Sequence, residues 1–171
     1  VLVVPQVHKD DRGYFMETWQ ANRFQEGGIG ATFVQENFSE SSRRTLRGLH
    51  YQIEQAQGKL VRVVSGRVFD VAVDLRRSSP NFGRWVGQVL SEENKHQLWV
   101  PPGFAHGFLV LSDTAAFEYK CTDYYAPQHE RSIRWDDPSI GIEWPIGDDE
   151  VPLLSARDAA APCLDEADTY A

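Results

Sequence analysis

Two segments of the sequence place a histidine beside residues that are typical of β-strands and tight turns. Segment 46–50 reads LRGLH and ends in His50, and Lys59 follows shortly downstream. Segment 102–107 reads PGFAHG and contains His106. A neutral imidazole with an unperturbed pKa of ~6.5 can remove protons at neutral pH, and an ammonium group stabilises negative charge that develops beside it. These residues therefore indicate proton chemistry on a β-rich scaffold.

The same histidines argue against a metal centre. A metal-binding barrel of the cupin type presents a His-x-His pair, a carboxylate and a further histidine after a Pro-x-Gly turn. Here Gln52 occupies the second position of the pair after His50, and Lys59 places a cation that repels a metal near the next strand. His106 keeps its expected place, although it also has a simpler interpretation as a cap of the preceding turn. Because the ligands are too few, we expect no bound metal.

Strand signals recur through the middle of the chain and are separated by turn residues. Strands rich in β-branched and aromatic residues are expected over residues 60–64, 68–75, 85–90, 97–100, 108–111 and 115–122. Helical signal is limited to residues 21–26 and 156–160, where Ser155 is a suitable N-cap. This pattern predicts one domain over residues 1–171, an all-β jelly roll of the cupin type with a few short peripheral helices.

Length, charge and cysteine content narrow the class of protein. The 171 residues suffice for one ordinary core, and 42% hydrophobic with 25% charged residues is a globular composition. A formal net charge of -8 argues against a broad nucleic-acid surface, and no apolar run is long enough to cross a membrane. Cys121 and Cys163 lie far apart and match no metal spacing, which favours a reducing, cytoplasmic location. We expect neither nucleic acid nor a membrane as a partner.

Several ordered motifs give the chain a family resemblance. They are segments 11–15 (DRGYF), 33–37 (FVQEN), 46–50 (LRGLH), 57–62 (QGKLVR), 103–107 (GFAHG), 117–125 (FEYKCTDYY) and 155–158 (SARD). In this order and spacing the sequence resembles the dTDP-4-dehydrorhamnose 3,5-epimerase family over essentially its whole length. The resemblance implies an isomerase without a cofactor that inverts C3 and C5 of a dTDP-4-keto-6-deoxyhexose, in which the C4 ketone acidifies the neighbouring protons.

The resemblance also implies roles for four catalytic residues. His50 corresponds to the base that removes the proton, and Asp158 to the partner that fixes its tautomer and stabilises the imidazolium. Tyr119 corresponds to the proton donor, because a phenol with an ordinary pKa of ~10 stays protonated until an enolate forms. Lys59 would stabilise the developing enolate oxygen by ~3 kcal/mol, the scale of one oxyanion donor.

A larger set of residues is implied to bind the substrate. Matching the family's motifs residue by residue gives Arg12, Phe15, Glu17, Gln35, Glu36, Asn37, Arg47, Lys59, His106, Tyr125, Glu130 and Arg157. The arginines suit a diphosphate, because each guanidinium offers a planar fork of donors. Family members carry Arg12, Phe15 and Glu17 into the site of the neighbouring subunit, so the resemblance implies a homodimer in which each subunit completes the other's site.

Two other functions remain open at this level. A relative that inverts only C3 or only C5, in an antibiotic-sugar pathway, would share the histidine, lysine and aspartate motifs. A non-catalytic cupin that binds a sugar nucleotide would share the fold alone, and the intact catalytic set argues against it.

Individual residues have structural interpretations as well. His50 has the alternative of a strand-end histidine satisfied by the backbone. Asp158 has the alternative of stabilising a helix N-terminus through the helix dipole. Tyr119 has the alternative of a core aromatic residue, in which case Tyr124 or Tyr125 would be the acid.

Overall fold

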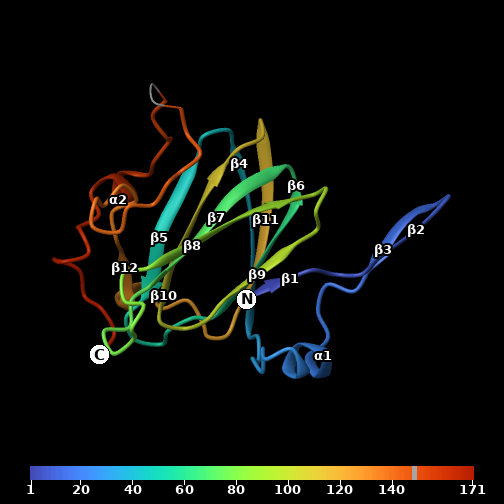
Figure 1. Cartoon of the computed structure of the whole chain (residues 1–171), viewed down its shortest axis with the longest axis horizontal. Coiled ribbons are helices and arrows are strands. Elements are labelled where there is room, and N and C mark those ends of the chain that lie inside the picture. The colour runs from blue at the N-terminus through green and yellow to red at the C-terminus, as the bar shows by residue number, and fades with distance from the viewer. Residues whose placement is uncertain (148–149) are drawn as a thin grey trace.

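Ten strands form two antiparallel five-stranded sheets in the computed structural model, which describes residues 1–147 and 150–171 (Figure 1). The first sheet has the order β1 (Leu2–Val3), β9 (Gln97–Val100), β6 (Lys59–Ser65), β11 (Thr114–Cys121) and β4 (Gln35–Ser42). The second has the order β12 (Glu130–Ser132), β5 (Leu46–Gln52), β10 (Phe104–Val110), β7 (Arg67–Asp74) and β8 (Trp85–Ser91). Two helices, α1 (Ala21–Glu26) and α2 (Ala156–Ala159), and one 3-10 turn, η1 (Pro127–His129), lie outside the sheets.

Burial explains why the strands of the two sheets differ in sequence. The edge strand β4 alternates between partly buried and exposed side chains, as expected for a strand with one solvated face. In contrast, β7 has a nearly continuous buried run, because apolar clusters cover both of its faces. One cluster lies between the sheets and includes Val61, Phe108 and Phe117. The other lies between the second sheet and the C-terminal segment, which is orange to red in Figure 1 and contributes Trp144.

A hairpin of β2 (Val7–Asp10) and β3 (Gly13–Met16) projects away from both sheets (Figure 1). We call residues 7–17 the arm. Phe15 is 70% exposed in this single chain, although it is a large apolar residue at the middle of the hairpin. The aromatic ring of Phe15 is therefore accessible to solvent.

The structure confirms the all-β prediction and most of the predicted elements. Five of the six predicted strands are present within two residues of the expected limits, while β10 begins four residues earlier than expected, at Phe104. Both helices are present, and the Ser155 hydroxyl accepts a hydrogen bond from the Asp158 amide at 3.1 Å, as expected of an N-cap. None of the helices in the described part of the chain is long and apolar enough to cross a membrane.

Candidate active site

A cavity of about 390 Å³ opens between the two sheets at the end where β4, β5, β6 and β11 converge. It is lined by Gln35, Asn37, Phe38, His50, Tyr51, Gln52, Gln57, Lys59, Tyr119, Tyr125 and Glu130. Polar and ionisable side chains from both sheets therefore face one cavity that is open to solvent, which is a usual setting of a site for a polar small molecule.

Two glycines bring the histidine strands β5 and β10 unusually close together. A Cβ atom at Gly48 would lie 2.6 Å from the Cα of Gly107, and Gly48 has a φ of +129° that side chains rarely adopt. The close approach sets His50 directly opposite His106 in the strand register. The glycine in segment 46–50 is therefore required by the placement of the histidines.

His50 forms a dyad with Asp158. Its Nε2 lies 2.5 Å from Asp158 Oδ1, and the Asp158 side chain is only 4% exposed, whereas that of His50 is 29% exposed. Because a carboxylate only accepts, Nε2 carries the proton and Nδ1 is the basic nitrogen. Burial raises the pKa of Asp158, but the His50 hydrogen bond and charge, with bonds from Ser155 and the Gly48 amide, outweigh it and hold that pKa below its ordinary value.

Lys59 and Tyr119 face the same cavity from β6 and β11. The Lys59 ammonium lies 5.9 Å from the centroid of the Tyr119 ring. Burial lowers the pKa of Lys59, although the neighbouring Cys121 opposes the shift. Burial raises the pKa of Tyr119, and Cys121 adds to this shift. The site thus combines a cation that releases its proton more easily than usual with a phenol that holds its proton more firmly.

A second histidine–carboxylate pair lies behind the first. His106 Nε2 is 2.9 Å from Asp70 Oδ2 and 3.0 Å from Oδ1, and Asp70 is fully buried on β7. Burial raises the pKa of this carboxyl, while the charge of His106 and its hydrogen bond lower it in part. A buried carboxylate needs such a partner. His106 therefore has a fixed ring orientation beside the cavity.

One wall of the cavity carries an acid between a phenol and a cation. Glu130 Oε2 accepts a hydrogen bond from the Tyr125 hydroxyl at 2.6 Å and lies 2.5 Å from Arg157 Nη1. Burial raises the pKa of Glu130, but these two partners outweigh it and hold the pKa below its ordinary value. Arg157 lines a smaller neighbouring cavity of about 250 Å³ that shares Tyr51 and Glu130 with the main one. The two cavities therefore have these two residues as a common boundary.

These groups can transfer protons between the two walls of the cavity. His50 stands on the second sheet, whereas Tyr119 stands on the first, so a ligand between the sheets has a base on one side and an acid on the other. Within residues 1–147 and 150–171, no three His, Cys, Asp or Glu side chains are grouped so that they could hold a metal ion.

Known proteins are similar to this chain in both sequence and fold. Residues 1–166 match the sequence profile of the family described as dTDP-4-dehydrorhamnose 3,5-epimerase. A dTDP-4-dehydrorhamnose 3,5-epimerase of Pseudomonas aeruginosa is 56% identical over 171 residues, which cover 99% of this chain and 93% of that protein. The chain belongs to the dTDP-4-dehydrorhamnose 3,5-epimerase family.

Solved structures similar to this chain include complexes with dTDP-sugars. A dTDP-6-deoxy-D-glucose-3,5-epimerase from Legionella pneumophila, in complex with dTDP-4-keto-L-rhamnose, is 56% identical with a TM-score of 0.94. The alignment covers 98% of this chain and 88% of that one. A 3′-monoepimerase from Streptomyces bikiniensis in complex with dTDP-quinovose is 38% identical with a TM-score of 0.89, covering 96% of this chain and 83% of that one. The fold is thus the cupin-type jelly roll that the sequence predicted.

The structure gathers most of the residues that the epimerase resemblance pointed to. His50, Lys59, Tyr119, Gln35, Asn37, Tyr125 and Glu130 line the main cavity, Asp158 and Arg157 contact two of these, and His106 lies opposite His50. Arg47 lies on β5, where its Nε donates to the Ser41 hydroxyl at 3.0 Å.

Four of the expected substrate-binding residues lie elsewhere in the single chain. Glu36 alternates with Gln35 and Asn37 on β4 and instead pairs with Lys120 at 2.5 Å, away from the cavity lining. Arg12, Phe15 and Glu17 are carried by the arm.

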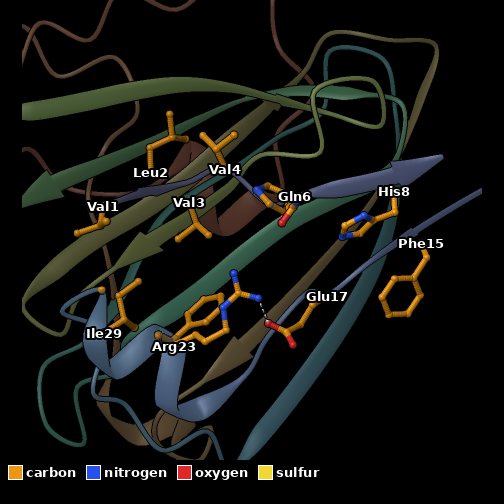
Figure 2. A pocket seen from close by; sticks show the side chains of 13 residues that line it. Val1, Leu2, Val3, Val4, Gln6, His8, Phe15, Glu17, Arg23 and Ile29 are labelled. Carbon is orange, nitrogen blue, oxygen red and sulfur yellow. Dashed lines mark hydrogen bonds and ion pairs between the residues drawn. The ribbon is translucent and has the colours of Figure 1, made fainter.

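The arm borders a cavity of its own. Figure 2 shows this cavity of about 400 Å³, in which Phe15 and Glu17 approach the N-terminal segment from one side and α1 closes the other. Val3, Val4 and Ile29 make part of its lining apolar.

Sequence reasoning missed Asp70 as a functional residue. The signal was present, because Asp70 interrupts the apolar stretch RVFDVAVD, and a carboxylate inside a buried strand requires a partner. It also missed strands β1 to β5 and β12. In β4 the polar composition of QENFSESS hides an edge strand.

Proposed function

We propose that this protein is a metal-independent dTDP-4-dehydrorhamnose 3,5-epimerase that converts dTDP-4-dehydro-6-deoxy-D-glucose to dTDP-4-dehydro-L-rhamnose. The observation that carries the proposal is the arrangement of the His50–Asp158 dyad and Tyr119 on facing sheets around one cavity. Inversion at carbon requires a base on one face of the sugar and an acid on the other, and this arrangement supplies both.

Each inversion follows from the positions of three groups. Nδ1 of His50 takes the proton from C3 or C5, and the electron pair of the broken C–H bond moves into the C4 carbonyl to form an enolate. The Lys59 ammonium stabilises the enolate oxygen. The Tyr119 hydroxyl then returns a proton to the opposite face of the same carbon. Before the next inversion the imidazolium releases its proton to water and the phenolate regains one.

The remaining residues bind the sugar nucleotide. In this proposal Arg47 and Arg157 hold the diphosphate through charge-assisted hydrogen bonds, which would let an acidic protein bind an anion. Tyr125 contacts the base or the sugar. The arm of one subunit supplies Arg12 and Phe15 to the site of the other, so the active species is a homodimer. Residues 1–171 act as one catalytic module.

Hydrogen exchange in deuterated water tests this function directly. Incubation with dTDP-4-keto-6-deoxyglucose should place deuterium at both C3 and C5, as followed by NMR, and a 4-ketoreductase should trap the L-lyxo product. Exchange at one carbon would identify a single-position epimerase, to which the Streptomyces bikiniensis 3′-monoepimerase gives structural precedent. No exchange would identify a non-catalytic sugar-nucleotide-binding protein.

A matched pair of variants assigns the chemistry to the dyad. His50→Ala should abolish exchange at both carbons while leaving affinity for dTDP within a few-fold. His129→Ala removes a histidine that pairs at 3.6 Å with the exposed Glu54 outside the cavity, and it should retain exchange. Sedimentation equilibrium measures the dimer, and a monomer with full activity would contradict the shared site.

A further inference from the structure

Side chains on the outer face of β9 hold the segment where the arm joins the barrel. We call Thr18 and Trp19 the arm root. Leu98 and Val100 point into the core between the sheets, so Gln97 and Trp99 lie on the opposite face of the strand. Gln97 is nevertheless only 2% exposed. Something other than the core must therefore cover it.

The arm root supplies this cover through one polar and one aromatic contact. The Gln97 amide Nε2 donates a hydrogen bond to the backbone carbonyl of Thr18 at 2.8 Å. Trp19 packs edge to face on Phe33 with ring centroids 5.8 Å apart, and Phe33 packs in the same way on Trp99 at 6.0 Å. Because Gln97 is buried, water cannot reach its amide group without opening this contact. Thr18 is therefore held in one orientation against β9.

The residue that precedes the arm root is held from the other side. Arg23 Nη1 donates to Glu17 Oε1 at 2.8 Å, and this ion pair is visible in Figure 2. Arg23 belongs to α1, whose first turn is capped by the Gln20 side chain, which accepts from the Arg23 amide at 2.7 Å. This ion pair is exposed to solvent and contributes little, so the Gln97 bond is the better-shielded contact at the base of the arm.

We propose that Gln97 is a positioning residue that sets the direction of the arm and thereby places Arg12, Phe15 and Glu17 in the site of the neighbouring subunit. This inference rests on the dimer of the proposed function. Arg12 precedes Thr18 by six residues, which span up to about 20 Å at ~3.3 Å per residue. A tilt of about 5° at the root moves the tip by about 2 Å, and a displacement of about 1 Å can lower a rate about a hundredfold.

A second contact between arm and barrel does not serve this purpose. Lys95 Nζ donates to the Tyr14 hydroxyl at 3.0 Å and lies 4.2 Å from the Tyr14 ring centroid. Tyr14 is 54% exposed, and exposed contacts of this kind are weak and easily replaced by water. Of these two side-chain contacts, the Gln97 bond is therefore the better shielded from water, because its donor belongs to a buried residue.

Mixed dimers show whether the Gln97 substitution affects the active site of the neighbouring subunit or the active site of its own subunit. Gln97→Leu removes the donor and should lower kcat/KM of the homodimer by about ten- to a hundredfold. Co-expression with His50→Ala gives mixed dimers in which the Gln97→Leu barrel, with an intact His50, receives the unaltered arm of its partner. Random pairing makes half the dimers mixed, each with one complete site, so activity should rise to about a quarter of wild type.

Other results would overturn the inference. Unchanged kcat/KM in the Gln97→Leu homodimer would show that the bond does not position the arm. A second result is that co-expression with His50→Ala fails to raise the low activity of Gln97→Leu, while co-expression of Arg12→Ala with His50→Ala recovers about a quarter of wild-type activity. This result would show that Gln97 acts only on the site of its own subunit. Failure of the Arg12→Ala pair as well would contradict the shared site itself, whereas exchange by the wild-type enzyme reports on the epimerase activity independently.

A core variant on a different strand serves as the control for an effect of lost stability. Val68→Ala truncates a fully buried side chain on β7 and should lower Tm without lowering kcat/KM at 25 °C. If Gln97→Leu does not fold, Gln97→Asn shortens the donor by one methylene, keeps the polar group and makes the same prediction in the mixed dimer. Loss of kcat/KM in Val68→Ala equal to that in the Gln97 variant would assign the effect to stability and refute the positioning role.

Discussion

Replacement of Lys59 by methionine tests the charge that stabilises the enolate. Methionine keeps an unbranched side chain of similar length and removes the ammonium. Loss of one group that stabilises an oxyanion lowers kcat by about a hundred- to a thousandfold, or ~3–4 kcal/mol. We expect the upper part of this range, because Lys59 is buried enough to lower its pKa and water screens its charge poorly.

The assay follows the step that the charge affects. Deuterium incorporation at C3 and C5 reports proton removal, and a coupled ketoreductase reports complete turnover. Stabilisation that exists only in the transition state appears in kcat rather than in KM. Lys59→Met should therefore lower both the exchange rate and kcat by similar factors.

The pH dependence gives the same residue a second signature. Burial lowers the pKa of Lys59 from 10.5 and raises that of Tyr119 from 10.0. Both groups act in their protonated forms. Because burial lowers the pKa of Lys59, the loss of its proton should contribute an alkaline limb to kcat at lower pH than an exposed lysine would. A guanidinium stays protonated throughout this range. The residual activity of Lys59→Arg should therefore extend to higher pH than that of wild type.

Lys120 provides the matched control. It lies on β11 next to Tyr119 in sequence, but it pairs with Glu36 at 2.5 Å outside the cavity. Partly exposed ion pairs contribute about 0–1 kcal/mol, so Lys120→Met should keep kcat within about threefold. If Lys59→Met retains more than a tenth of wild-type kcat, the proposed enolate contact is refuted.

Three further perturbations have outcomes fixed by the geometry. Asp158→Asn removes the carboxylate that holds the basic tautomer, and kcat should fall by about a hundred- to ten-thousandfold in steady-state assays. Gly48→Ala places a Cβ atom 2.6 Å from Gly107 Cα and should lower the free energy of unfolding by about 3 kcal/mol or more in urea. Asp74 has its pKa lowered to about 2 chiefly by Arg76, so Asp74→Asn should cost about 2 kcal/mol at pH 7. Because the folded-state pKa is the lower one, that stabilisation is complete above about pH 4 and is lost as the pH falls toward 2.

Each of these perturbations has a control in the same chain. Gly28 also has a positive φ of +86° but nothing within 4 Å of its Cβ position, so Gly28→Ala should cost only about 1 kcal/mol. Asp136 pairs with Arg134 at the surface, and Asp136→Asn should cost less than about 1 kcal/mol. Equal effects for Gly48 and Gly28, or for Asp74 and Asp136, would contradict the packing and burial arguments. Asp158→Asn with kcat within threefold of wild type would remove the dyad from the mechanism.

Local signals explain which elements were predictable from sequence. The strand at 97–100 and the capped helix after Ser155 depend on residues within a few positions of each other, and both are present at the expected places. Strand β4 was missed because one of its faces is solvated, so its composition resembles a loop. Its pairing with β11, between residues 72 to 86 positions apart in the chain, supplies the stabilisation that its own residues lack.

The sequence by itself determined the chemistry that is available: an imidazole, a phenol, an ammonium and a carboxylate, in motifs that belong to one family. The family resemblance implied which of these groups meet, and only the tertiary structure supplies the contacts that bring them together. His50 and Asp158 are 108 residues apart, and their contact depends on α2 docking beside β5. The lowered pKa of Lys59 and the raised pKa of Tyr119 arise chiefly from burial between the two sheets. Gln97 reads as an ordinary strand residue until the arm root covers it. Contact and burial depend on distant parts of the chain packing together, which local sequence does not encode.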